Sequence, residues 1–182
     1  MIWIFGYGSL IWRPNFDFSD RQPAKIFGWS RRFYQGSPDH RGTAENLGRV
    51  VTLIPTLNET CYGIAYGIDS NKRDEIFHYL NIREQGGYDL IETDIQLLNG
   101  DSVQGYVYTA NENNPFYLGP ASLENMATQI LNSRGPSGSN LEYFINLYEA
   151  LKQFAPSEDH LTKLYQEISE RNTTTNDKDS EK

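Results

Sequence analysis

Two glycines, a tyrosine and a serine interrupt an apolar run near the start of the sequence. Residues 4–12 read Ile-Phe-Gly-Tyr-Gly-Ser-Leu-Ile-Trp, so a hydroxyl and a permissive backbone fall inside a segment typical of a buried strand. Glycine lets consecutive amides turn toward one point and lets a ligand approach the main chain. Such amides bind carboxylates or the oxyanion of an acyl transfer. A bulged strand whose glycines allow tight packing explains the pattern equally well, so both interpretations stay open.

Three other candidate functions of this segment do not fit the spacing of its glycines and serine. A dinucleotide-binding loop needs a third glycine and a following helix, and Leu10 to Pro14 does not open a helix. A phosphate-binding loop needs a Gly-Lys-Ser or Gly-Lys-Thr ending, which the segment lacks. A nucleophile elbow needs glycines on both sides of the serine at a fixed spacing. Ser9 also has no evident His–carboxylate partner, which favours a hydrogen-bonding role over a nucleophilic one.

Glu84 is the carboxylate whose neighbours suggest proton transfer. It lies between Arg83 and Gly86-Gly87, on a segment that joins an expected helix to an expected strand. A glutamate that accepts and returns a proton needs a raised pKa in a poorly solvated place, and the glycines would let the loop wrap over a ligand. Most glutamates are solvated surface charges, so the residues around Glu84 do not decide its role by themselves.

Five basic side chains gather in a short part of this acidic chain and could hold an anionic ligand: Arg31, Arg32, His40, Arg41 and Arg49. A solvated basic face or surface ion pairs would explain them as well. Gln35, Gly36 and Ser37 are better contact candidates, because their polar groups follow two aromatic residues. Tyr143 could offer its phenol to a site or pack in the core.

Composition restricts the class of protein. The 182 residues carry a net charge of −8, which argues against nucleic acid as a partner. No apolar run approaches the ~18 residues of a membrane span and no charged leader precedes one, so we expect a cytoplasmic, non-membrane protein. The three histidines are far apart and Cys61 is the only cysteine, so we expect no metal site, no disulfide and a buried, inert thiol. The composition gives no indication of oligomeric state.

Strands are expected first and helices later, which indicates an α+β fold with a mostly antiparallel sheet that could be open or closed as a small barrel. Pro55 should end one strand, and Asn99-Gly100-Asp101 should form a hairpin turn. Ser70, Ser139 and Ser157 are expected to open helices. We expect one domain over residues 1–170 and a disordered polar tail over 171–182. The expected strands are 2–5, 49–54, 61–68, 88–98 and 102–108, and the expected helices are 70–80, one after Pro120, 139–154 and one from residue 157.

Five separated stretches together resemble the ChaC branch of the γ-glutamylcyclotransferases. They run in order from about Ile2 to Phe154, and the N-terminal glycine segment alone would be weakly specific because the wider superfamily shares it. The stretches are Phe5–Trp12, Ser30–Gly42, Gly48–Leu53, Arg83–Tyr88, and Tyr117–Ala121 with Gly135–Tyr143.

The resemblance implies a small, mostly antiparallel β-barrel with flanking helices. It also implies a cofactor-free cleavage of glutathione to 5-oxoproline and cysteinylglycine, with Glu84 as the catalytic acid–base. Gln85 stands where many relatives carry Lys. Alternatives are a cyclotransferase for another γ-glutamyl substrate and a non-catalytic small-molecule binding module. The expected substrate-binding residues are Ile4, Phe5, Gly6, Tyr7, Gly8, Ser9, Leu10, Arg31, Gln35, Gly36, Ser37 and Tyr143.

Overall fold

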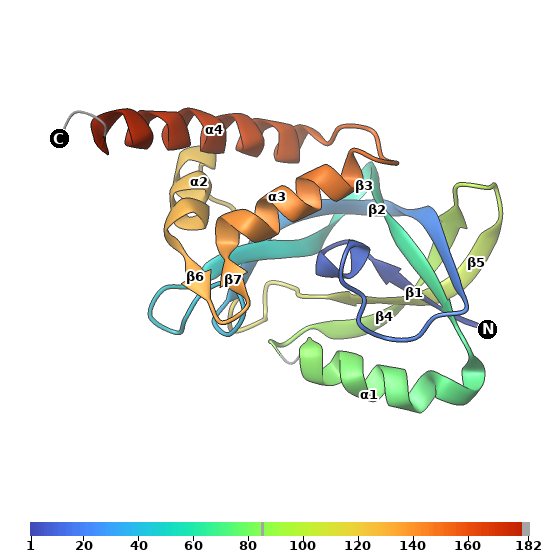
Figure 1. Ribbon diagram of the computed structural model, residues 1–182. Coiled ribbons are helices and arrows are strands. Elements are labelled where there is room, and N and C mark those ends of the chain that lie inside the picture. The colour runs from blue at the N-terminus through green and yellow to red at the C-terminus, as the bar shows by residue number, and fades with distance from the viewer. Residues whose placement is uncertain (85, 180–182) are drawn as a thin grey trace.

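A closed five-stranded barrel forms the centre of the molecule (Figure 1). The computed structural model describes residues 1–84 and 86–179, without the side chains of 173–179. Neighbouring strands follow the order β1-β3-β2-β4-β5 and pair antiparallel, except that β1 and β5 close the barrel in parallel. The predicted α+β barrel is therefore confirmed. The strands are β1 (Ile2–Gly6), β2 (Asp20–Ser37), β3 (Gly48–Ile68), β4 (Asp89–Leu97) and β5 (Ser102–Thr109).

The two longest strands differ from the sequence prediction. Strand β3 continues through Pro55, which lies opposite Trp29 of β2, so the prediction that Pro55 ends a strand was wrong. Next to this point the register shifts between Phe27 and Trp29, and Gly28 has a φ of +78°. A proline is tolerated at such an irregularity because the regular ladder of hydrogen bonds is already interrupted. Strand β2 was not predicted.

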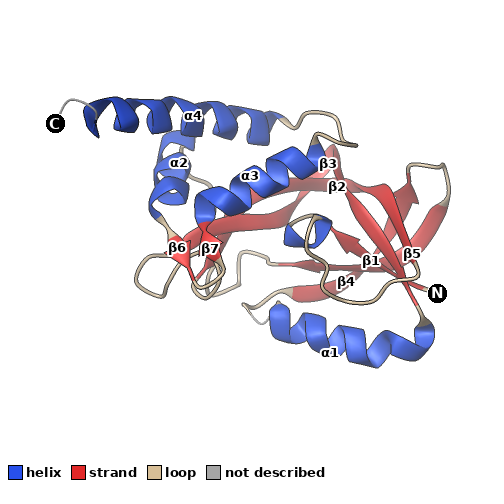
Figure 2. Cartoon of the chain, in the orientation of Figure 1, coloured by secondary structure: helices blue, strands red, loops and turns tan. Residues whose placement is uncertain are grey.

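Helices cover the barrel on opposite sides (Figure 2). Helix α1 lies on one side, and α2, α3 and α4 lie on the other (Figure 1). The Oγ of Ser139 accepts the amide of Glu142, so the predicted cap of α3 is confirmed. At the start of the α1 region Asp69 is the capping residue, rather than Ser70. The helices are α1 (Arg73–Arg83), α2 (Leu123–Asn132), α3 (Asn140–Leu151) and α4 (Asp159–Asp179); a small pair, β6 (Arg134–Gly135) and β7 (Gly138–Ser139), joins α2 to α3.

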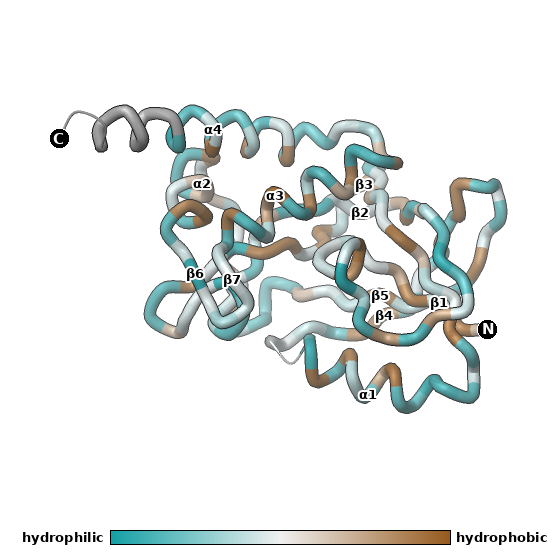
Figure 3. Tube along the Cα trace, viewed as in Figure 1, coloured by the Kyte–Doolittle hydropathy of each residue, from teal (hydrophilic) through white to brown (hydrophobic). Residues whose placement is uncertain are grey.

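The helices pack through apolar faces that the sequence predicted. Leu161, Leu164 and Ile168 of α4 are buried, and the apolar positions of this helix face α2 and α3 (Figure 3). Tyr148 of α3 stacks on Tyr165 of α4 with ring centroids 4.4 Å apart. Aromatic pairs of this kind add to the stability that area burial provides.

Helix α4 extends beyond the expected end of the domain. Its backbone is helical through Asp179, whereas the sequence predicted disordered chain from Arg171 onward. Arg171 forms ion pairs with Glu167 one turn earlier and with Glu124 of α2, at 2.7 and 2.9 Å, so the helix is still attached to the domain at that residue. No helix in the described part of the chain is long and apolar enough to cross a membrane.

Candidate active site

A cavity of about 220 Å³ opens at one end of the barrel. The segments that border it include the turn after β1, the end of β2 and the loop that follows it, the start of β3, the C-terminal end of α1 and the start of α3. Segments far apart in the sequence thus meet at one hollow. The cavity brings together most of the predicted site residues, namely Phe5, Tyr7, Gly8, Ser9, Leu10, Gly36, Ser37, Glu84 and Tyr143.

Glu84 follows the last residue of α1 and faces this cavity. Its amide donates to the carbonyl of Leu80 at 2.8 Å, and its side chain is 18% exposed. Burial raises the pKa of the Glu84 carboxyl; the Arg83 guanidinium opposes this rise, and the negative charge of Asp39 adds to it. A carboxyl with a raised pKa holds a proton more readily than a solvated glutamate does, which suits a group that must accept a proton and return it. Gln85 lies outside the described residues.

Three tyrosines of the cavity lining lie near the Glu84 carboxyl: Tyr7 and Tyr143, which are buried, and Tyr88, which is partly buried. Tyr88 donates its hydroxyl hydrogen to the carbonyl of Val51 at 3.2 Å, and the amide of Val51 donates to Oη of Tyr143 at 3.4 Å. Burial raises the pKa of Tyr7, Tyr88 and Tyr143, so these phenols keep their protons. These three tyrosines therefore add polar but uncharged groups to a lining that also carries the charges of Arg83 and Asp39. Tyr88 was missed as a lining residue, although it closes the predicted Arg83–Tyr88 motif.

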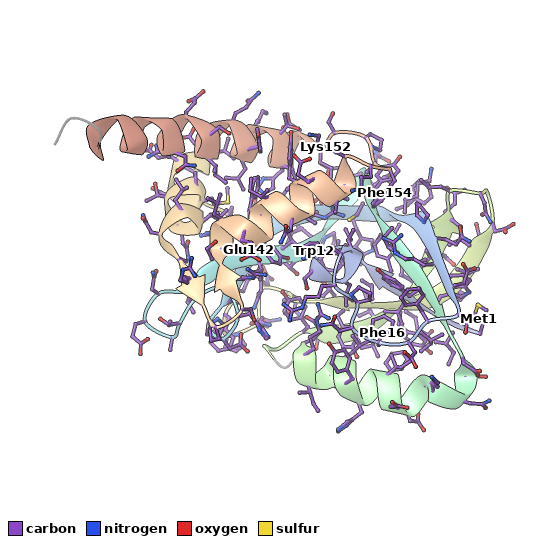
Figure 4. All side chains as sticks on the ribbon, viewed as in Figure 1. Met1, Trp12, Phe16, Glu142, Lys152 and Phe154 are labelled. Atoms are coloured by element: carbon purple, nitrogen blue, oxygen red, sulfur yellow. The ribbon has the colours of Figure 1, made fainter. Side chains whose placement is uncertain are left out.

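The N-terminal glycine segment forms the opposite wall. A Cβ on Gly6 would lie 2.6 Å from Cβ of Leu10, and one on Gly8 would lie 3.1 Å from Oη of Tyr143. Gly6 is thus required by close approach, whereas a Cβ on Gly8 would need Tyr143 or Val51 to move by a few tenths of an ångström. The segment turns into a 3₁₀ turn at Ser9–Ile11, and the amides of Gly8, Ser9 and Leu10 donate to no backbone carbonyl of the described chain. Trp12, below α3 in Figure 4, packs edge-on against Tyr143 with centroids 5.4 Å apart.

Arg83 joins the two walls. Its Nη2 donates to Oγ of Ser9 at 2.8 Å, and its Nη1 donates to the carbonyls of Arg13 and Pro14 at 2.8 and 3.0 Å. Its Nε lies 3.6 Å from Oε1 of Glu84. Ser9 thus accepts a hydrogen bond from an arginine of the opposite wall.

Four predicted site residues lie outside the cavity lining: Ile4, Gly6, Arg31 and Gln35. Ile4 is fully buried in the core. Arg31 is also buried and pairs with Glu158 at 3.0 Å. Gln35 donates instead to Oδ1 of Asn114 at 3.1 Å. A register shift between Arg32 and Gln35 changes which residues of β2 face the cavity, and a sequence motif shows proximity along the chain but not the direction of a side chain.

The basic residues do not form one cluster. Arg49 donates to the carbonyls of Phe33 and Gly119 at 2.9 and 3.0 Å, which is a structural role. Arg32 pairs with Glu59 at the surface. His40 and Arg41 are the members that line the cavity. Cys61 is buried, and burial raises the pKa of its thiol to about 12, which agrees with the predicted inert thiol.

The barrel thus carries one cavity that is bordered by both the desolvated carboxyl of Glu84 and the N-terminal glycine segment. The chain belongs to the ChaC-like protein family, whose model matches residues 2–171. A human relative, glutathione-specific gamma-glutamylcyclotransferase 1, is 42% identical over 90% of this chain and 76% of its own length. Gamma-glutamylcyclotransferase 2-3 of Arabidopsis thaliana is 43% identical over 92% of this chain and 88% of its own. A solved yeast gamma-glutamylcyclotransferase specific to glutathione superposes with a TM-score of 0.87 at 32% identity, over 93% of this chain and 96% of that chain.

Proposed function

We propose that this chain cleaves glutathione to 5-oxoproline and cysteinylglycine, without a cofactor, and so acts as a lyase in glutathione catabolism. The observation that carries the proposal is Glu84, a desolvated carboxyl with a raised pKa that faces a cavity on a ChaC-like barrel. The names of the human relative and the yeast structure support the substrate.

The reaction is an intramolecular aminolysis. The α-amine of the γ-glutamyl group attacks its own γ-carbonyl carbon, a five-membered ring closes, and the bond to the cysteine nitrogen breaks. Glu84 accepts a proton from the attacking amine and later donates it to the departing nitrogen, so the carboxyl ends in its starting state. Burial supports both steps, because a carboxylate of raised pKa is a stronger base and its acid form persists closer to neutral pH.

The glycine segment holds the γ-glutamyl group in this proposal. The amides of Gly8, Ser9 and Leu10 have no backbone acceptor in the described chain and stand beside the cavity, where they could bind the α-carboxylate or the γ-carbonyl oxygen. Tyr143 stands over Gly8 and adds a phenol to the same wall. Holding amine and carbonyl in attack geometry contributes rate in addition to proton transfer.

A second candidate is a cyclotransferase for another γ-glutamyl substrate. Two Arabidopsis relatives, at 43% and 36% identity, are named gamma-glutamylcyclotransferase without a stated substrate. Their names therefore do not say which amine the γ-glutamyl group is attached to. In either case we propose a cytoplasmic protein that acts on a small molecule and does not bind nucleic acid, in line with its net charge of −8.

One assay separates these candidates from a binding module that lacks catalysis. The purified chain is incubated with reduced glutathione, and 5-oxoproline and cysteinylglycine are followed by mass spectrometry. Formation of both products at equal rates supports the proposal. Turnover of a γ-glutamyl amine but not of glutathione favours the second candidate, and glutathione binding without either product would leave only a binding module.

A further inference from the structure

Asn114 lies behind the loop that carries Glu84 and contacts it closely. It follows β5, is 8% exposed and does not line the cavity. Its Nδ2 donates to the carbonyl of Gly86 at 2.9 Å and to that of Gly87 at 2.5 Å. Both donor hydrogens of this side chain are therefore directed at the turn that leads away from Glu84.

The other end of the Asn114 amide is fixed to the barrel. Its Oδ1 accepts from the amide of Phe116 at 2.8 Å and from Nε2 of Gln35 at 3.1 Å. Two donors on one oxygen define which end of the amide is the carbonyl, so the NH₂ group must face the glycines. Gln35 itself is fully buried in β2, directly before the cavity residues Gly36 and Ser37.

The described backbone of the turn after Glu84 is also held at its two ends, where the amide of Glu84 donates to Leu80 and the amide of Tyr88 donates to the carbonyl of Glu84 at 3.3 Å. Between these points lie two glycines, which have more backbone freedom than other residues. Gly87 has a φ of +85°, and a Cβ there would lie 2.7 Å from Nδ2 of Asn114, so the loop packs directly on this amide.

We infer that Asn114 is a positioning residue for the reaction: it fixes the Glu84–Tyr88 turn to β2 through Gln35 and thereby sets the place of the Glu84 carboxyl. This inference rests on the proposed function and adds a residue outside the cavity to it. Misplacement of a reacting group by about 1 Å can cost ~10²-fold in rate, so loss of these two hydrogen bonds should lower kcat.

Two substitutions separate positioning from simple support. Asn114→Ala removes all four hydrogen bonds. Asn114→Asp keeps the shape of the side chain and the two bonds that Oδ1 accepts, but places an acceptor against the carbonyls of Gly86 and Gly87. If Asn114 acts only through the bonds that its Oδ1 accepts from Gln35 and Phe116, aspartate retains that role. A positioning role depends on the two bonds that Nδ2 donates to the turn, and it is lost in both variants. Asn113→Ala is the matched control, since it removes the same group from the exposed neighbouring residue.

The variants are compared by steady-state kinetics on glutathione and by amide hydrogen exchange across residues 84–88. We expect kcat to fall roughly 10- to 100-fold in both Asn114 variants with KM within about threefold. Exchange in the turn should speed up while the barrel strands keep their protection. Asn113→Ala should match the parent. Asn114→Asp with kcat within twofold of the parent, or unchanged exchange in the turn, would overturn the inference.

Gly87→Ala tests the same contact from the loop side if an Asn114 variant does not fold. It should lower kcat and speed exchange in the same way, and parent-like values in this variant would count against the inference. Exchange does not depend on the substrate. A parent protein that leaves glutathione intact therefore refutes the proposed function, whereas exchange still decides whether Asn114 holds the turn.

Discussion

Two partly buried glutamates of this molecule each face an arginine, and the two arginines make different hydrogen bonds. Glu158, before α4, is 16% exposed and lies 3.0 Å from a fully buried Arg31; Glu84 is 18% exposed and lies 3.6 Å from Arg83. Burial raises the pKa of both carboxyls, and each borders a hollow. Burial and access therefore do not distinguish a candidate catalyst from a structural residue.

The hydrogen bonds of the two arginines make the difference. Arg31 donates directly to Oε1 of Glu158 and also to Sγ of Cys61 and the carbonyl of Tyr62, so it attaches α4 to the barrel. Arg83 directs its hydrogen bonds to Ser9 and to the carbonyls of Arg13 and Pro14, and it makes only a longer contact with Glu84. The carboxyl of Glu84 thus remains available to a bound molecule, whereas that of Glu158 is engaged.

The largest expected effect is on activity at Glu84. Glu84→Gln keeps the size of the side chain but cannot accept the proton, so kcat should fall by ~10²–10⁴-fold. Glutathione binding, measured by calorimetry, should persist. Glu149→Gln, on the exposed face of α3, is the control and should leave kcat unchanged. Activity of Glu84→Gln within tenfold of the parent would remove Glu84 from the acid–base role.

The reverse pattern is expected at Glu158. Glu158→Ala leaves the charge of Arg31 buried without its partner, which should lower the free energy of unfolding by about 3 kcal/mol. Urea unfolding measures this loss, and kcat per folded molecule should stay within twofold of the parent. Glu59→Ala breaks the exposed pair with Arg32 and should cost under about 1 kcal/mol. Equal losses in the two variants would contradict the contrast between buried and exposed pairs.

A smaller, pH-dependent effect is expected at His160, which also attaches α4. Its Nε2 accepts the amide of Phe33 at 3.3 Å, and burial, together with the charge of Arg32, lowers its pKa to about 4. The unfolded chain takes up a proton near pH 6.5, so this contribution to stability is present above pH 6.5 and is lost as pH falls toward 4.

His160→Gln should remove that part of the pH dependence. The comparison is between urea unfolding of parent and variant at pH 7 and pH 4.5, and the difference should be a few kcal/mol at most. The comparison of parent and variant isolates the histidine, because the raised pKa of Glu158 acts in the opposite direction in both proteins. Parallel pH curves for the two proteins would show that His160 does not titrate as described.

The smallest expected effect is a shift of the acidic limb of the kcat/KM pH profile toward higher pH. Glu84 must be ionised to accept a proton, so kcat/KM should fall as pH drops through its pKa. Because burial raises that pKa, the acidic limb should lie above the ordinary range of a glutamate. Initial rates across an acidic pH series, with unfolding checked at each pH, measure it. A limb at the ordinary glutamate position would mean that the carboxyl is solvated in the working enzyme.

Sequence patterns predicted the local parts of the fold well. The cap at Ser139 depends on a hydrogen bond to the amide three residues later, and the hairpin turn depends on Gly100 with a φ of +105°. Both are decided within a few residues, so their signals are visible in the sequence. Strand β2 gave no such signal, because its register shifts interrupt the regular alternation of apolar and polar residues.

The site followed the same rule. The sequence by itself was enough to select the glycine segment, the Glu84 carboxyl and the cap of the helix that carries Tyr143 as candidates. Each of these features depends on residues that lie close together along the chain. Only the tertiary structure decided that Gly36 and Ser37 line the cavity while Arg31 pairs with Glu158, and that Asn114 contacts the turn after Glu84. Burial and pairing depend on residues brought together from distant segments, and those same contacts raise the pKa of Glu84.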